Sequence, residues 1–76
     1  MSTQSRTRQE MSTVGVRIRF YRTLRGLSQR EFARRLRMSP AQLSRYETGH
    51  TEPRLPVLRR IARALNMPLS EFFYGR

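Results

Sequence analysis

The sequence contains no cysteine, no lysine and no aspartate, and only one histidine, among its 76 residues. Without cysteine, neither a disulfide framework nor a cysteine-ligated metal site can form. The five acidic residues are all glutamate, and together with His50 they are too few to suggest a metal cluster or a catalytic acid–base pair. The composition therefore predicts a protein with no cofactor, no bound metal and no enzymatic activity.

Long apolar runs are also missing, since the longest uninterrupted one is the tripeptide FFY at residues 72–74. A membrane-spanning helix needs about 20 consecutive apolar residues, and a signal peptide needs an apolar core that this N-terminus lacks. We therefore expect a soluble protein of the cytoplasm.

What the sequence has in excess is arginine. All sixteen basic residues are arginine, and against five acids they give a formal net charge of +11. A biased genome could explain arginine in place of lysine, but it does not explain the surplus of base over acid. Because so positive a field attracts polyanions, nucleic acid is the favoured partner, followed by an anionic membrane surface or an acidic protein.

The first residues differ from the rest of the chain. The segment MSTQSRTRQEMST is polar, has no branched aliphatic residue and shows no periodicity, which predicts a flexible basic N-terminal arm over residues 1–13. The tripeptide MST occurs at both 1–3 and 11–13, so Met11 could be an alternative start. Residues 14–76 are predicted to form one domain, near the lower size limit for a chain that folds around a single core.

From Val14 onwards the apolar residues follow a helical spacing. Val14, Ile18 and Tyr21 define the inward face of a first helix, which Gly26 can end. A second apolar stripe lies on the same helix at i, i+4 and i+8: Val16, Phe20 and Leu24. This stripe could pack against the arm or an adjacent helix end, or it could bind a protein partner.

Two more helices follow, each with a serine at its start. Ser28 is a suitable N-cap, and Glu31 completes a capping box at the start of the second helix. Ser39 is a suitable cap for a third helix, in which Pro40 fits the first turn and Gly49 fits the left-handed position after the end. The predicted inward residues of the second helix are Phe32, Ala33 and Leu36.

The last part of the chain predicts two further helices. After the turn TEPR, the i, i+3, i+4, i+7 pattern of a fourth helix is formed by Leu58, Ile61, Ala62 and Leu65. The segment PLSEFFYGR predicts a short fifth helix at residues 68–76. Because no segment alternates with period two, we expect five helices and no sheet.

The segment 26–49 describes a helix-turn-helix. Two short serine-capped helices are separated by a turn at Arg37 and Met38, with the small residue Ala33 where they cross and Leu43 as the apolar anchor of the second. In such a unit the second helix, the recognition helix, lies in the major groove of DNA, while the first crosses the backbone.

Residues 14–73 resemble the Xre/Cro-type helix-turn-helix regulators, which include phage repressors and restriction–modification controller proteins. The matching segments are GLSQREFARRL, LSRYETG, Pro53 in the following turn and LRRIARAL. The resemblance implies an all-α, compact five-helix fold like that of lambda repressor, with the helix-turn-helix formed by helices 2 and 3. It also implies a non-enzymatic protein of a bacterial or phage nucleoid, with double-stranded DNA and no membrane as its partner.

The resemblance further implies which residues contact DNA. The base-facing positions are Arg45, Ser44, Ala41 and Pro40, and Gln42 could reach either a base or a phosphate. Arg45 is the strongest candidate, because arginine can donate two hydrogen bonds to guanine, although a phosphate contact or an exposed arginine is the alternative. The phosphate-contacting positions are Gln29, Arg30, Ser39, Thr48, His50 and Thr51. Gln29 could instead only cap its own helix, and His50 could simply be exposed.

Arg22 and Glu47 match a pair that forms a partly buried salt bridge between the first and third helices in the family. Its role would be to fix the orientation of the recognition helix rather than to add much net stability. The sequence departs from the family at Arg37, where glycine is usual, and in the stripe of Val16, Phe20 and Leu24, where polar residues are more frequent. A left-handed Arg37 would cost about 1 kcal/mol.

One recognition helix covers only a few base pairs, so regulators of this type usually act as two-fold dimers. The candidate interface is the apolar cluster of the fifth helix: Leu69, Phe72, Phe73 and Tyr74. The alternative is that the phenylalanines close the core. We expect one of the two to lie in the core and the other at the interface.

The predicted function is a small autoregulator that binds a (pseudo)palindromic operator, such as a restriction–modification controller or a Cro-like repressor. The alternative is an antitoxin that binds a toxin through the stripe of the first helix and also binds DNA.

Overall fold

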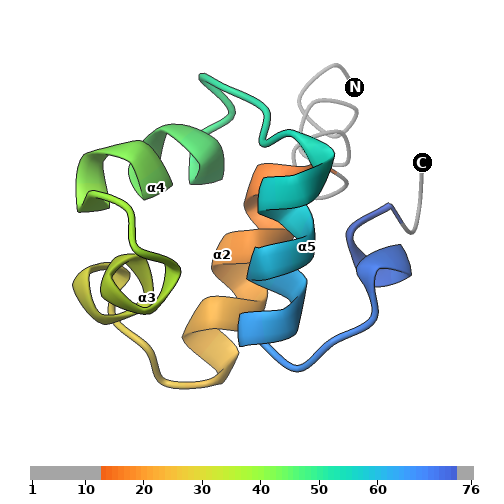
Figure 1. Ribbon diagram of the computed structural model, residues 1–76, viewed down its shortest axis with the longest axis horizontal. Helices are drawn as coiled ribbons and strands as arrows, with labels where there is room; N and C mark the ends of the chain where they lie inside the picture. Colours follow the sequence, from red (N-terminus) through yellow and green to blue (C-terminus); the bar gives the residue numbers. More distant parts are fainter. Residues whose placement is uncertain (1–12, 74–76) are drawn as a thin grey trace, which may run out of the picture.

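The computed structural model describes residues 13–73, and within this range the fold is all-α, as predicted, with no strand. Its elements are α2 (Val14–Leu24), α3 (Gln29–Leu36), α4 (Pro40–Glu47), α5 (Leu55–Ala64) and the 3-10 helix η1 (Leu69–Phe72). The fifth predicted helix is thus a single 3-10 turn and not an α-helix. Figure 1 shows α3 and α4 together at one end of the fold and η1 at the other. Residues 1–12 of the predicted arm, and Tyr74, lie outside the described residues.

The helix starts follow the predicted capping chemistry. At α3, the backbone N–H of Glu31 donates to Ser28 Oγ and the Glu31 carboxylate accepts from the Ser28 N–H, both at 3.1 Å. This hydrogen bond from the Ser28 backbone holds the pKa of Glu31 below its ordinary value. At α4, Ser39 Oγ accepts from the N–H of Gln42 at 3.1 Å, and Pro40 occupies the first turn. The caps at Ser28 and Ser39 are therefore confirmed.

Each of the four described α-helices is followed within two residues by one with positive φ: Gly26, Arg37, Gly49 and Asn66. At the end of α3, the N–H of Met38 donates to the carbonyl of Ala33 and the N–H of Arg37 to that of Arg34, both at 3.0 Å. This pair of bonds defines a Schellman motif, whose left-handed residue is usually glycine. Arg37 adopts that conformation with φ 59° and ψ 45°, so the turn of the helix-turn-helix keeps the geometry that glycine would give it.

We expect Arg37→Gly to stabilise the protein. A non-glycine residue in the left-handed region costs about 1 kcal/mol, and removing that cost raises the melting temperature of a domain of this size by about 4–8 °C. Thermal unfolding followed by circular dichroism measures the change. Arg37→Ala is the matched control, because it removes the same charge but keeps the Cβ atom. An equal gain in both variants would assign the effect to charge and not to backbone strain.

The core takes side chains from every element. Its fully or almost fully buried large residues are Ile18, Phe32, Leu36, Leu43, Ile61, Leu65 and Phe72. The inward faces predicted for the four α-helices are confirmed, although Tyr21 is only half-buried. In η1, hydrogen bonds from Glu71 to Pro68 and from Phe73 to Ser70 turn Phe72 into the core. Phe72 is completely buried and Phe73 is 40% exposed, so Phe72 is corrected from an interface residue to a core residue.

The close packing of α2 against α4 depends on Gly15, a residue absent from the predicted core and site. A Cβ atom added to Gly15 would lie 2.1 Å from the carbonyl oxygen of Tyr46 and 3.0 Å from that of Glu47. Both oxygens belong to the backbone of α4 and cannot rotate away. Glycine therefore sets the distance between the first helix of the domain and α4. An isolated glycine inside a helical pattern was the available clue, since it usually has a packing reason.

Candidate nucleic-acid interface

The predicted recognition helix is α4, and its outward face carries the predicted base-contacting residues. Pro40, Ala41 and Arg45 are exposed, while Gln42 and Ser44 are half-buried. Leu43 is completely buried and anchors the helix in the core, as predicted. The first turn of α4 thus offers no side-chain donor from Pro40 or Ala41, which leaves Arg45 as the long cationic side chain on this face.

Arg45 is held by the segment that follows α4. Its Nη2 atom donates to the hydroxyl oxygen of Thr51 at 3.2 Å, and its backbone carbonyl accepts from the N–H groups of His50 and Thr51 at 2.9 and 3.3 Å. Thr51 was predicted to contact phosphate, and the structure gives it this additional contact. The contact restricts the rotamers of Arg45 before any ligand is bound, which lowers the entropy cost of positioning its guanidinium.

A second set of hydrogen bonds joins the end of α4 to His50. The Thr48 hydroxyl lies 2.8 Å from the Ser44 carbonyl and 2.8 Å from Nδ1 of His50. Because the carbonyl can only accept, the single hydroxyl proton of Thr48 belongs on that bond, and Nδ1–H of His50 then donates to Thr48 Oγ1. Thr48 and His50 are both exposed, so two of the predicted phosphate-contacting residues are brought together beside α4.

Beneath this surface, a buried hydrogen-bond network connects α2, α3 and α4. Arg22 Nε donates to Glu47 Oε2 at 2.7 Å and Arg22 Nη2 donates to Glu47 Oε1 at 3.1 Å. Arg22 Nη1 donates to the carbonyl of Leu27 at 2.7 Å. The Arg22 and Glu47 side chains are only 10% and 2% exposed. The salt bridge implied by the family resemblance is therefore present, and its geometry is bidentate.

Gln29 completes the network from the first position of α3. Its side-chain Nε2 donates to Oε1 of Glu47 at 3.1 Å, so it links the start of α3 to the end of α4. The side chain thus does more than cap its own helix, which was the alternative interpretation. Gln29 is half-buried, whereas the neighbouring Arg30 is exposed at the helix N-terminus, where free N–H groups favour anions. Ser39 is exposed, but its hydroxyl already accepts the capping bond.

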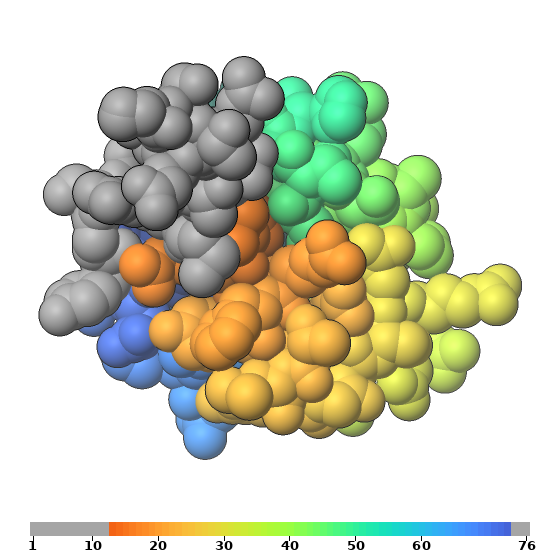
Figure 2. Space-filling view, turned by 180° about the vertical axis from the view of Figure 1, so that it is seen from behind, coloured from red at the N-terminus to blue at the C-terminus, as the bar shows by residue number. Residues whose placement is uncertain are grey.

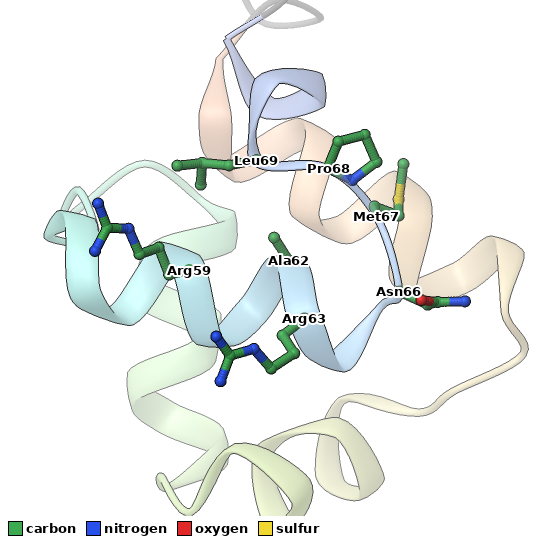
Figure 3. A pocket seen from close by; sticks show the side chains of 7 residues that line it. All are labelled: Arg59, Ala62, Arg63, Asn66, Met67, Pro68 and Leu69. Atoms are coloured by element: carbon green, nitrogen blue, oxygen red, sulfur yellow. The ribbon is translucent and has the colours of Figure 1, made fainter.

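Away from α4, an open hollow of about 440 Å³ lies where α5 runs into η1 (Figure 3). Its lining residues are Arg59, Ala62, Arg63, Asn66, Met67, Pro68 and Leu69. Leu69, one of the predicted interface residues, is half-buried at this hollow, whereas Phe73 follows directly after η1. Among the described helices, none combines the length and the apolar character needed to cross a membrane.

The chain matches a family model described as Helix-turn-helix over residues 18–72, more than half of its length. It is 38% identical over 60 residues to an HTH-type transcriptional regulator of Sinorhizobium medicae (strain WSM419), and equally to one of Rhizobium meliloti (strain 1021). The matched region covers 79% of this chain but 43% of each relative. The matched part of the chain therefore corresponds to less than half of the length of these curated relatives.

Solved structures with the same arrangement of helices include two regulators. The clp gene regulator ClgR from Corynebacterium glutamicum is 30% identical with a TM-score of 0.74, over 78% of this chain and, in its two crystal structures, 77% and 63% of that one. Bacillus thuringiensis PlcR, crystallised in complex with the peptide PapR7 and DNA, is 31% identical with a TM-score of 0.72. That match covers 82% of this chain and 22% of PlcR.

Proposed function

This chain belongs to the helix-turn-helix family of transcriptional regulators, and from that premise we propose that it binds a specific sequence of double-stranded DNA as a homodimer and regulates transcription from a (pseudo)palindromic operator. The observation that carries the proposal is the exposed face of α4, oriented by the buried contacts of Glu47. The similarity to PlcR, whose crystal contains DNA, supports the same conclusion.

In the proposed complex, base discrimination depends mainly on Arg45. Its guanidinium can donate two hydrogen bonds to O6 and N7 of one guanine, while Ser44 and Gln42 assist from half-buried positions. Pro40 and Ala41 can contribute only apolar contacts, for example with a thymine methyl group. Thr51 positions Arg45 and leaves its outer N–H groups for the base.

Phosphate contacts surround this reading face. Arg30 and Gln29 lie at the start of α3, and Thr48, His50 and Thr51 follow α4. His50 is exposed and held beside the end of α4 by its contact with Thr48, where its ring can reach a phosphate. These contacts fix the register of the protein on DNA and carry no sequence information themselves.

The proposed dimer places two α4 helices in successive major grooves, about one helical turn of DNA apart. Its interface is at the η1 end of the fold, where Leu69 lines the open hollow and the exposed Phe73 follows directly after η1. Control would follow from the concentration of the protein through dimerisation, as in a small bacterial or phage autoregulator acting at the nucleoid. Sedimentation of the full chain with and without Phe73→Ser tests this interface, and an unchanged dimer in the variant would exclude it.

Selection of bound sequences from a random DNA pool tests the main proposal. The variant Arg45→Ala tests the residue to which we assign base discrimination. We expect Arg45→Ala to lose about 1–3 kcal/mol of discrimination at one base-pair position. The matched control is Arg30→Ala, which should weaken binding to all sequences about equally and lower the salt dependence by about one released counterion. Full retention of sequence preference by Arg45→Ala would remove Arg45 from its assigned role.

A second candidate function is that of an antitoxin, which binds a protein toxin and also regulates its own operon. The observation in its favour is the outer face of α2, where Phe20 is 55% and Leu24 is 65% exposed and Val16 is half-buried. Copurification with the product of an adjacent gene, lost on substitution of Phe20, would favour this function. Tight operator binding by the protein alone, with no such complex, would favour the first.

A further inference from the structure

The outer face of α2 has the properties of a docking surface. Phe20 and Leu24 are one helical turn apart and are the most exposed large apolar residues of the described chain. Beside them is a shallow hollow of about 240 Å³, lined by Val16, Arg17, Phe20 and Tyr21. Apolar residues scattered singly on a surface need no explanation, but a contiguous apolar stripe next to a hollow marks an interaction site. We call Val16, Phe20 and Leu24 the α2 stripe.

The floor of the surface is already rigid. The ring of Tyr21 contacts the rings of Phe20 and the buried Phe72 edge to face, with centroid distances of 5.2 and 5.8 Å. Its hydroxyl donates to Oε1 of Glu71 at 2.9 Å, and this bond, together with burial, raises the pKa of Tyr21 above its ordinary value. A partner that covers Phe20 therefore meets a preorganised aromatic pair, which lowers the entropy cost of binding.

The charges around the α2 stripe select the partner. Arg19 and Arg25 are exposed and flank the Phe20–Leu24 segment in sequence, and Arg17 lines the hollow. Two of them are also held by the fold, because Arg25 Nε donates to the Leu65 carbonyl at 2.9 Å and Arg17 Nη1 donates to the Glu71 carbonyl at 3.4 Å. The nearby carboxylate of Glu71 already accepts from Tyr21. A second copy of this chain, packed through the same face, would place arginine against arginine. DNA would pair with the arginines but would leave the apolar side chains exposed.

The N-terminal segment of this chain is another possible occupant of the α2 stripe. The sequence of that segment is unsuitable for covering the stripe. Residues 1–12 contain two arginines, one glutamate and only methionine as large apolar residues. Such a segment supplies neither the acidic groups that would complement the arginines nor two apolar side chains one helical turn apart. The charge pattern is complementary to an apolar stripe flanked by carboxylates.

We propose that the α2 stripe, with Arg17, Arg19 and Arg25 around it, binds an acidic amphipathic helix of a partner protein. Two apolar side chains of that helix cover Phe20 and Leu24, and its carboxylates face the arginines, in the manner of a helix laid on an apolar surface. The charged rim contributes specificity and association rate, while the aromatic centre contributes most of the affinity.

The surface is separate from the predicted DNA-reading face. In Figure 2, residues of α2, in orange, occupy the middle of the view, whereas α4, in green, reaches only its margin. The inward residues of α2 that face α4, among them Gly15 and Arg22, lie on the opposite side of that helix from Phe20. A partner on the α2 stripe can therefore bind while α4 is on DNA. The inference deepens the second candidate function and does not depend on DNA binding.

The test uses the full chain and a blocked synthetic peptide of about 14 residues made of glutamate, alanine and leucine, with the leucines at i, i+3, i+4 and i+7. The control peptide has the same composition with leucine alternating at period two. Fluorescence anisotropy should show the helical pattern binding at least about tenfold more tightly than the control, a difference of about 1.4 kcal/mol. Equal affinities would mean charge attraction alone and would overturn the proposal.

Variants locate the site on the protein. Phe20→Ser with Leu24→Ser, and separately Arg19→Glu, should each lower the peptide affinity by about tenfold or more. Leu55→Ser is the matched control, because Leu55 is also an exposed apolar residue but lies at the start of α5. It should bind the peptide like the wild type. Equal losses in Leu55→Ser, or none in Phe20→Ser with Leu24→Ser, would contradict the assignment.

Two further measurements separate the alternatives. The stripe variants should bind the operator with unchanged affinity, and this result would show that they fold. If the wild type itself does not bind an operator, only the proposed DNA function is contradicted, because the peptide assay does not use DNA. If the double serine variant does not fold, the exposed Arg19→Glu variant decides alone. A dimer that dissociates on substitution of Phe20 and Leu24 would identify a second copy as the occupant and overturn the proposal. A higher affinity for the peptide after deletion of residues 1–10 would identify the N-terminal segment as the occupant and would also overturn it.

Discussion

Replacing Gly15 with alanine is expected to lower the free energy of unfolding by about 3 kcal/mol and the melting temperature by more than about 10 °C. The new methyl group would lie 2.1 Å from the Tyr46 carbonyl oxygen. Because the methyl carbon and the oxygen are each fixed to a helix backbone, no side-chain rotation can relieve the clash. The higher helix propensity of alanine, worth about 1 kcal/mol, offsets only part of this cost. Thermal and urea unfolding measure the change.

The same substitution should weaken DNA binding, because α4 must move away from α2 to accept the methyl group. Gly26→Ala is the control. Its Cβ atom would meet nothing within 4 Å, so it suffers only the backbone cost of a φ of 72°. We expect Gly26→Ala to lose about 1 kcal/mol of stability and to keep its operator affinity. If Gly15→Ala were as stable as the wild type, the close approach of α2 and α4 would be wrong.

The elements that sequence predicted well are those specified by local chemistry. Ser28 with Glu31, and Ser39 with Pro40, start helices by bonds within four residues, so the pattern of the chain is sufficient to find them. The inward faces follow from the 3.6-residue period in the same way. Gly15 differs, because its requirement comes from the backbone of α4, more than thirty residues later.

The 3-10 geometry of η1, and which of Phe72 and Phe73 is the buried one, also escaped prediction. Two adjacent phenylalanines have the same apolar character, and only the packing of α2 and α5 around η1 determines which one is buried. At the candidate site, the Arg22–Glu47 pair was implied by the family resemblance and not by local pattern. The contacts of Gln29 with Glu47 and of Arg45 with Thr51 join helix ends and loops, where the sequence shows no periodicity.

Glu47→Ala is expected to cost about 3–5 kcal/mol of stability, because it leaves Arg22 buried without its carboxylate. Gln29 loses the same acceptor, so the start of α3 and the end of α4 are no longer joined. DNA binding should weaken along with stability. Glu47→Gln is the conservative control, since it keeps the shape and one acceptor oxygen but removes the charge, and an intermediate loss is expected. A melting temperature unchanged by Glu47→Ala would rule out the buried pair.

Loss of stability alone does not show that the pair orients α4, and a double variant separates the two effects. Arg22→Met with Glu47→Leu replaces the buried charges with apolar groups of similar size, an exchange that is often neutral or stabilising. We expect its melting temperature to return to that of the wild type or above it.

Its operator affinity should stay lower by about tenfold or more, because the introduced methionine and leucine side chains can pack in several arrangements. In the wild type, the bidentate Arg22–Glu47 contact and the Gln29 bond to the same carboxylate hold one angle between α3 and α4. Calorimetric unfolding and operator titration on one preparation measure both. Full recovery of operator affinity in the double variant would limit the pair to stability and leave the orientation of α4 to core packing through Leu43 and Gly15.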